Sequence, residues 1–425
     1  MRHRLAFATG LAALLCVVGR LDGWTVPNLT FQPSNPPTSW PQWRGPSRDG
    51  VVPAASVPKA WPAALQEGWS AQVGEGYSTP VVGGGRVFVH SRRDPDEIVT
   101  AFDLATGKQI WSDTHRAPFT KNQYASAMAK GPNATPLLAG SRLYTFGVSA
   151  VLTAYDAVSG RVVWRHDYTK DIDSSKLFCG TSASPILVDG AVLVHVGDDR
   201  GGVFRAFDAE TGRLRWEQKG PGPGYASPVL ATIQGEKQIV TMTDKSVVGV
   251  STGTGAILWS FPFPDEWNEN IVTPVIAGST IIVSGIRKGT FGLAVGKTGA
   301  AWSVTQKWHS PDTAMYMSTP VLHGGVLYGL STKRKGQFFA LDSETGRTLW
   351  MTDGREGANA HLVVAGANLV VQLDSGEMLV APVSKTGFKA EHRYPVGKSA
   401  TYTHPVLTPG GVLVRDQTHL RFWRY

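Results

Sequence analysis

The sequence is short of cysteine and of charged side chains. It has two cysteines, and one of them, Cys16, lies in an apolar stretch near the N-terminus. If that stretch is removed, Cys179 has no partner in the chain, which excludes an internal disulfide and a cysteine-type metal site. We expect Cys179 to be a small buried apolar residue rather than a nucleophile. Charged residues make up 17% of the chain, below the roughly 25% of an average protein, so the surface carries few charges.

The N-terminal residues 1–23 combine a basic start with a short apolar run, which predicts a secretory signal peptide. The run is shorter than the ~20 residues of a transmembrane helix, and retention as a membrane anchor is the alternative. Leu15 precedes Cys16, whereas a lipoprotein signal favours a small residue there. We therefore expect a secreted protein in the periplasm or another extracytoplasmic compartment, with no transmembrane span after cleavage.

Residues 24–62 are rich in proline, which resists regular structure. They form either an extended linker or a strap lying on the folded domain. Three tryptophans, Trp40, Trp43 and Trp61, favour the strap because indole rings pack poorly in water. The net charge of +8 is spread along the chain, and no interleaving of basic and aromatic residues suggests nucleic-acid binding.

Residues 63–425 carry an eleven-residue pattern that recurs in tandem, as AFDLATGKQIW (101–111), AYDAVSGRVVW (154–164), AFDAETGRLRW (206–216) and ALDSETGRTLW (340–350), with a weaker copy ending at Trp259. Each copy predicts a strand, a turn and a second strand. The Asp caps the turn, the Gly supplies a positive φ, and the Trp packs between neighbouring sheets. These structural positions are Asp103, Gly107, Trp111, Asp156, Gly160, Trp164, Asp208, Gly212, Trp216, Trp259, Asp342, Gly346 and Trp350.

A second marker precedes each unit: a small or polar pair, then Pro, then an apolar strand broken by a glycine turn. Together the two markers give four short strands in about 45 residues, the period of a propeller blade. We predict an all-β, eight-bladed propeller of four-stranded antiparallel blades. The eighth unit lacks its outer strand, which residues 65–73 can supply. A seven-bladed ring is the alternative, because the units around 292–302 and after Ser375 are degenerate.

The tandem A-x-D-x-x-[T/S]-G-x-x-x-W pattern resembles the pyrroloquinoline-quinone (PQQ) repeat. That repeat builds the eight-bladed propellers of quinoprotein dehydrogenases and of the lipoprotein propeller of the outer-membrane assembly machine. The resemblance implies, for an enzyme, an adjacent cysteine pair, a calcium site and bound PQQ. This sequence has no cysteine pair and no recognisable calcium carboxylates. We predict no metal site and no cofactor, with PQQ and calcium as the alternative.

The long connections between blades are expected to emerge on one face, and their ends beside the proline strands face a central funnel. The residues at these ends mix aromatic, amide and imidazole groups that suit a polar, planar ligand or a peptide. We predict ligand contacts from Tyr77, Asn133, Thr181, Tyr225, Asn270, Tyr316, His361, Tyr402 and His404. His361 and His404 come from adjacent units and can approach each other.

No catalytic residue is predicted, because the sequence shows neither a recognisable Ser-His-Asp arrangement nor a recognisable nucleophile elbow. The first hypothesis is a secreted, monomeric, non-catalytic propeller that binds a protein or another envelope component. The second is a quinoprotein-like dehydrogenase that holds PQQ and calcium in the funnel. The third is a small-molecule or glycan sensor that uses the same funnel.

Overall fold

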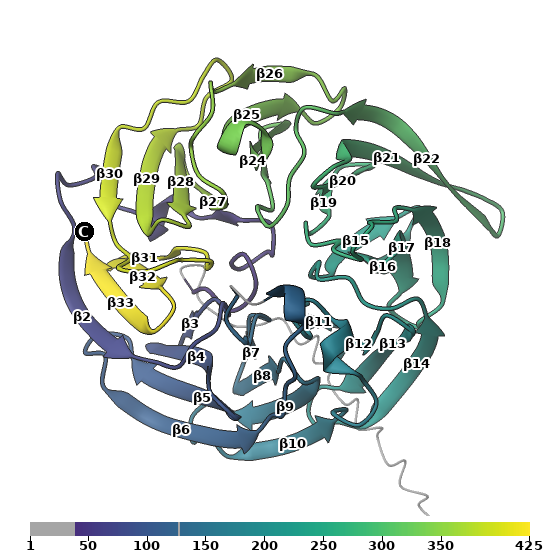
Figure 1. Ribbon diagram of the computed structural model, residues 1–425, viewed down its shortest axis with the longest axis horizontal. Helices are drawn as coiled ribbons and strands as arrows, with labels where there is room; N and C mark the ends of the chain where they lie inside the picture. The colour runs from purple at the N-terminus through teal and green to yellow at the C-terminus, as the bar shows by residue number, and fades with distance from the viewer. Residues whose placement is uncertain (1–38, 126–127) are drawn as a thin grey trace, which may run out of the picture. The chain divides into compact units, whose positions relative to one another are not determined.

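The computed structural model describes residues 39–125 and 128–425. The predicted signal peptide, residues 1–23 with Cys16, and the first part of the proline-rich segment lie outside the described residues. Eight sheets surround a central axis (Figure 1). The predicted all-β, eight-bladed propeller is therefore confirmed, and the seven-bladed alternative is wrong. Over the two described ranges, no helix combines the length and hydropathy needed to cross a bilayer.

The first six blades each take four strands from one continuous stretch of chain. From the innermost to the outermost strand, blade 1 consists of β3 (Val81–Gly83), β4 (Arg86–Arg93), β5 (Asp96–Asp103) and β6 (Gln109–Arg116), and blade 2 consists of β7 (Leu137–Ala139), β8 (Arg142–Phe146), β9 (Val151–Asp156) and β10 (Val162–Asp167). In the same order, blade 3 consists of β11 (Ile186–Val188), β12 (Ala191–Asp198), β13 (Gly201–Asp208) and β14 (Leu214–Gly220), and blade 4 consists of β15 (Val229–Ile233), β16 (Glu236–Met242), β17 (Ser246–Ser251) and β18 (Ile257–Pro262). Blade 5 consists of β19 (Val275–Ala277), β20 (Thr280–Gly285), β21 (Gly289–Thr298) and β22 (Ala301–Ser310), and blade 6 consists of β23 (Val321–His323), β24 (Val326–Ser331), β25 (Gln337–Asp342) and β26 (Thr348–Met351).

The last two blades use strands from the N-terminal region. Blade 7 consists of β27 (Ala360–Ala365), β28 (Asn368–Leu373), β29 (Glu377–Pro382) and β30 (His392–Pro395), and β1 (Val51–Val52) adds a parallel fifth strand beside β27. Blade 8 consists of β31 (Val406–Thr408), β32 (Gly411–Arg415) and β33 (His419–Arg424), and β2 (Gln66–Gln72) pairs antiparallel with β33 as its outer strand. Four short 3-10 helices complete the described elements: η1 (Ala54–Ser56), η2 (Gln123–Ala125), η3 (Ser174–Lys176) and η4 (Lys333–Lys335).

The repeated Asp-x-x-Thr-Gly turns have the geometry of capped turns. In blade 1 an Asp103 carboxylate oxygen accepts hydrogen bonds from the Thr106 backbone N–H at 2.8 Å and the Thr106 hydroxyl at 2.7 Å. Gly107 follows with φ +71°, a conformation that is costly for residues with a Cβ. The same bonds recur at the turns that begin with Asp156, Asp208 and Asp342.

Each outer-strand tryptophan packs on the turn of the next blade. The Trp111 indole N–H donates to the Ala157 carbonyl at 3.1 Å, and a Cβ added at Gly160 would lie 2.6 Å from the Trp111 ring. The turn glycine is therefore required twice, for its positive φ and for the approach of the indole ring. Equivalent contacts join Trp69 to Gly107, Trp164 to Gly212 and Trp216 to Gly255.

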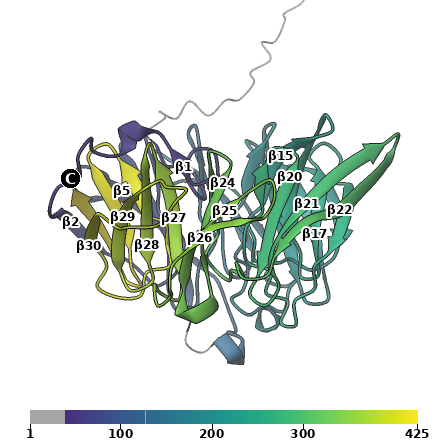
Figure 2. The same ribbon diagram turned by 90° about the horizontal axis from the view of Figure 1, so that it is seen from above.

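Blade 5 departs from this arrangement because its Asp turn is missing. Its hairpin β21–β22 is long and projects beyond the neighbouring blades (Figures 1 and 2). Trp259 of blade 4 has no such turn to pack on, and its indole N–H donates to the Gln238 side chain of its own blade at 2.6 Å. Trp308, rather than Trp302 of the degenerate repeat copy, packs on Gly346 of blade 6.

The residues that precede the inner strands are linked in a ring around the axis. In blades 1 to 5 the backbone N–H of each donates to the hydroxyl of the equivalent residue in the next blade, at 2.9 to 3.3 Å; we call this the hydroxyl ring. Its hydroxyl members, from blade 1 to blade 6, are Thr79, Thr135, Ser184, Ser227, Thr273 and Thr319. Blade 8 joins blade 1 through the His404 N–H and the Thr79 hydroxyl. The ring explains why Ser or Thr precedes the strand proline.

Candidate functional site

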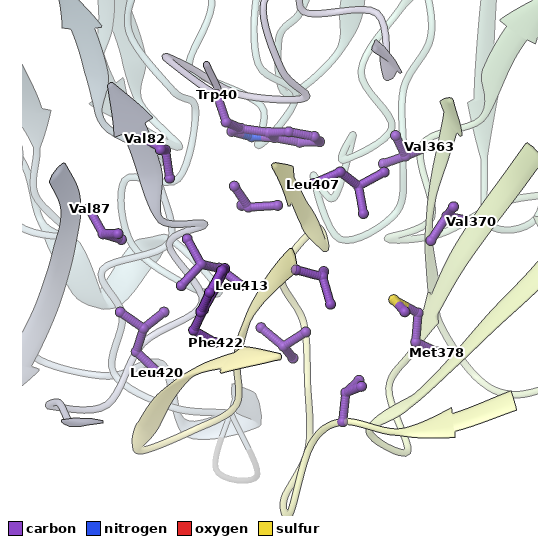
Figure 3. Packing of buried hydrophobic residues seen from close by; sticks show 14 of the residues in the cluster. Trp40, Val82, Val87, Val363, Val370, Met378, Leu407, Leu413, Leu420 and Phe422 are labelled. Carbon is purple, nitrogen blue, oxygen red and sulfur yellow. The ribbon is translucent and has the colours of Figure 1, made fainter. Parts of the chain in front are cut away.

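An N-terminal segment crosses the middle of the ring and is visible there in purple (Figure 1). We call residues 40–52 the axial plug. Trp40 at its start is fully buried and packs among Val82 of blade 1, Val363 of blade 7 and Leu407 of blade 8 (Figure 3). The plug also hydrogen-bonds to backbone groups of other residues around the axis, among them Leu138, Ser184, Pro185, Pro228, Pro320 and Val364.

A cavity of about 120 Å³ lies on one side of the plug, at the ends of the connections between blades. We call it the tyrosine cavity. Six of the nine residues predicted from the sequence line it: Tyr77, Asn133, Tyr225, Tyr316, His361 and Tyr402. Trp43 of the plug also lines it, together with Phe178, Cys179 and Met317 among others. The topology thus brings together side chains from at least six blades.

Three of the tyrosine hydroxyls also hold neighbouring connections in place. The Tyr77 hydroxyl accepts from the Ala129 N–H at 3.1 Å, and the Tyr225 hydroxyl accepts from the Phe178 N–H at 2.7 Å. Both hydroxyls act as acceptors in these bonds, so each retains a proton to donate. Tyr77 also meets Tyr402 edge to face, with ring centroids 4.7 Å apart. The rings of Tyr77 and Tyr225 are therefore held in place in the cavity wall, and their hydroxyl protons are available for a ligand.

The third tyrosine reveals a residue that sequence reasoning missed. The Tyr316 hydroxyl donates to a Glu269 carboxylate oxygen at 2.7 Å. Glu269 is buried, and burial raises the pKa of its carboxyl group despite that hydrogen bond. None of the nine residues predicted to face the funnel is acidic, so Glu269 supplies a carboxyl group beside a cavity tyrosine that was not predicted. The only signal was the position of Glu269 next to Asn270, in a connection whose end was already expected to face the axis.

Cys179 lies in the wall of the same cavity. Burial, with a smaller contribution from Glu269, raises the pKa of its thiol to about 12. A thiol of this kind is protonated at neutral pH, and the thiolate is the nucleophilic form. The geometry therefore agrees with a packing role for Cys179.

Two histidines and one plug tryptophan meet beside the cavity. The rings of His361 and His404 have centroids 4.7 Å apart, and Trp43 meets His404 edge to face at 4.7 Å. Burial, followed by the charge of Arg44, lowers the pKa of His361 to about 4. Burial, followed by the charges of His361 and Arg44, lowers the pKa of His404 well below its ordinary value. Both rings are neutral at pH 7.

Three predicted residues do not line the cavity. The Asn270 amide donates to the backbone carbonyls of Thr243, Asp244 and Phe263, which fixes a connection. Thr181 is buried, and its N–H donates to a backbone carbonyl. His404 lies behind Trp43. Several lining residues were not predicted, among them Trp43, which lies outside the repeats in the sequence and so gave no indication that it reaches the axis.

Within the described residues, no three His, Cys, Asp or Glu side chains come together in a geometry that could hold a metal ion.

Comparison with known proteins gives a family match over most of this chain. The family profile described as "Outer membrane protein assembly factor BamB" matches residues 66–120, 95–352 and 308–390. The protein of that name from Yersinia pestis is 24% identical over 347 residues, which is 81% of this chain and 72% of the relative.

Two solved structures share the fold. BamB from Moraxella catarrhalis superposes with a TM-score of 0.58 at 16% identity, covering 85% of this chain and all of the other. A europium-containing methanol dehydrogenase superposes with a TM-score of 0.66 at 13% identity, covering 91% of this chain and 89% of the other. At such identities the superpositions establish the propeller alone.

Proposed function

This chain belongs to the PQQ-like repeat family described as outer membrane protein assembly factor BamB, and on that premise we propose that it is a non-catalytic binding scaffold. Its partner is a protein of the cell envelope, and it acts outside the cytoplasm. The partner binds over the face that opens into the tyrosine cavity and inserts one side chain there. The relatives named for outer-membrane assembly support an envelope partner.

The size and lining of the tyrosine cavity carry this proposal. Its volume of about 120 Å³ is close to that of an engineered cavity of about 150 Å³ that binds benzene. Small-molecule sites typically measure about 300–1,000 Å³. The cavity therefore accommodates one side chain rather than a whole cofactor. Tyrosine and tryptophan are also the residues that most often supply binding energy at the centre of protein interfaces.

The quinoprotein alternative does not fit the residues at the axis. A tricyclic quinone needs a flat space between two surfaces, and Trp43 of the axial plug lies against His404 at this point. The plug is also bonded to inner strands on several sides of the ring. Opening a quinone-sized space would require the plug to leave and Trp40 to lose its buried position.

Site-specific photo-crosslinking tests the proposal in cells of the native source. A photoreactive residue at position 402, in the cavity wall, should crosslink one defined envelope protein. The same residue at the exposed Lys108, in the turn between β5 and β6 of blade 1 on the opposite face, should not crosslink it. Replacing Tyr77 and Tyr316 with Ala should reduce the position-402 product about tenfold, since each lost contact at such an interface costs at least ~1 kcal/mol. Equal crosslinking from both positions would exclude a partner at the tyrosine cavity.

A ligand titration separates the alternative functions. Addition of PQQ with calcium should leave the tryptophan fluorescence unchanged after correction for absorbance. Saturable, calcium-dependent quenching would instead favour the dehydrogenase hypothesis. Saturable binding of a glycan that Tyr402→Ala abolishes would favour the sensor hypothesis.

A further inference from the structure

A second cavity lies on the other side of the axial plug. Its volume is about 390 Å³, within the range of small-molecule sites of about 300–1,000 Å³. It shares no lining residue with the tyrosine cavity. Two plug arginines, Arg44 and Arg48, contribute to its lining, and inner-strand residues of blades 3 to 6 form its apolar walls. We call it the arginine cavity.

The two guanidinium groups are buried and unequally satisfied. Arg44 is 1% exposed and Arg48 is 5% exposed. Arg48 donates to the carbonyls of Pro228 at 3.1 Å and Pro185 at 2.9 Å, and more weakly to others. Within residues 39–125 and 128–425, Arg44 donates only to the Pro320 carbonyl, at 2.5 Å, and its buried Nε finds no hydrogen-bond partner. Donor capacity is therefore left over at Arg44.

Neither guanidinium forms an ion pair with a carboxylate of the described residues. The charge of Asp49 acts on Arg44, but Asp49 is exposed and its carboxylate accepts from the Val51 N–H at 2.8 Å. Burial lowers the pKa of Arg44 to about 10 and, together with the charge of Arg44, lowers that of Arg48 to about 9. The plug therefore holds two buried cations that lack a full counter-charge. Because a buried charge is costly unless it is paired, an anion in the cavity would stabilise them.

We propose that the arginine cavity binds a small carboxylic acid with a compact, branched apolar body. The carboxylate faces Arg44 and Arg48, where a planar guanidinium can donate two parallel hydrogen bonds. The apolar body lies against inner-strand side chains such as Leu187 and Leu230. This activity goes beyond the proposed protein-binding function, since it uses a different cavity on the other side of the plug.

A matched pair of probes tests the charge requirement on the full chain. We would measure the binding of 4-methylpentanoate and of 4-methylpentanamide by isothermal titration calorimetry, with inorganic phosphate as a third probe. The acid should bind at least tenfold more tightly than the amide, which has the same apolar body without the charge. It should also bind more tightly than phosphate, which lacks that body. Equal affinities for acid and amide would overturn the proposal.

A charge pair at the cavity rim tests the location. Leu230 lines the cavity and is 45% exposed, so a charged residue there should leave the fold intact. Leu230→Glu should weaken binding of the acid at least tenfold, whereas Leu230→Lys should preserve or strengthen it. Tyr402→Ala, in the other cavity, should change nothing. Identical effects of Glu and Lys at position 230 would place the acid elsewhere.

Arg44→Met is the direct variant, and it should abolish binding of the acid if the protein still unfolds cooperatively. Since Arg44 holds the plug to blade 6, this variant can lose the fold. The Leu230 pair then decides the outcome.

Discussion

Blades 1 to 6 and blades 7 and 8 are closed in different ways. In blades 1 to 6 a Ser or Thr precedes each inner strand and completes the hydroxyl ring. In blades 7 and 8 the equivalent residues are His361 and His404, whose rings contact each other instead. There the N-terminal segment supplies what the repeats lack: β1 extends blade 7, β2 completes blade 8, and Trp40 fills the space between them.

The difference indicates that blades 7 and 8 depend on the N-terminal segment as well as on each other. The hydrophobic cluster around Trp40 combines residues of the N-terminal segment with residues of blades 1, 7 and 8 (Figure 3). Blades 1 to 6 rest on local turn and strand patterns, whereas the closure of the ring rests on contacts between residues hundreds of positions apart. Variants that act on blades 1 to 6 (one sector) and spare blades 7 and 8 with the N-terminal segment (the other sector), or the reverse, can test this division.

The largest effect is expected at Trp40. Trp40→Ala should lower the free energy of unfolding by about 3–5 kcal/mol, since it removes a fully buried indole and leaves a cavity. Urea unfolding followed by circular dichroism measures the loss. Trp267→Ala is the matched control, because Trp267 is 54% exposed and only stacks under Arg287; it should cost about 1 kcal/mol or less. Similar losses for the two variants would show that the N-terminal segment does not carry the closure.

The same division separates what the sequence predicts from what it does not. The Asp turn around Asp103 and Gly107 and the blade count followed from local patterns that repeat. The outer strand of blade 8 followed from counting strands. The path of the plug through the axis did not follow, because Trp43 and Arg44 contact residues far along the chain and repeat nowhere. Glu269 was missed for a related reason: its burial depends on Tyr316 of another blade.

The second effect concerns the tryptophan contacts that both sectors share. Gly107→Ala should cost about 2–4 kcal/mol, because it combines a positive φ with a Cβ 2.5 Å from the Trp69 ring of β2. Gly160→Ala should lower the free energy of unfolding by nearly the same amount, since it disturbs the equivalent contact, of Gly160 in blade 2 with Trp111 in blade 1. Gly84→Ala should cost only the ~1 kcal/mol of backbone strain, since no atom lies within 4 Å of the added Cβ. Chemical denaturation of the three variants ranks the costs, and a much smaller loss at Gly107 than at Gly160 would mean that β2 is weakly held.

The third effect is the part of the pH dependence of stability that His361 of blade 7 contributes. The pKa of His361 is about 4 in the folded protein, against about 6.5 in an unfolded chain. The unfolded state therefore binds more protons between these values, and stability is lost as the pH falls from 6.5 to 4. The loss attributable to His361 approaches about 3 kcal/mol at pH 4, at 1.36 kcal/mol per pKa unit.

His361→Gln should reduce this part of the pH dependence, because the variant has no proton to bind at that position. Unfolding free energies of both proteins at pH 7.5, 6, 5 and 4 give the difference in slope. Parallel curves for the variant and the parent protein would show that His361 protonates freely in the folded state, and its burial would then not keep it neutral.

The smallest effect concerns single hydroxyls, and it distinguishes a hydroxyl in the ring from one outside it. Thr135→Val removes the acceptor of the buried Thr79 N–H, and an orphaned buried donor costs about 1–3 kcal/mol. Thr145 is equally buried in β8 of the same blade, but its hydroxyl has no hydrogen-bond partner in the part of the chain that the structure describes. Thr145→Val should therefore be neutral or stabilising, since it removes an unsatisfied polar atom. Urea unfolding of both variants makes the comparison within one blade, where chemistry and burial are matched. If Thr145→Val destabilises as much as Thr135→Val, the ring bonds contribute nothing specific, and blades 1 to 6 would be held by strand packing and tryptophan contacts alone.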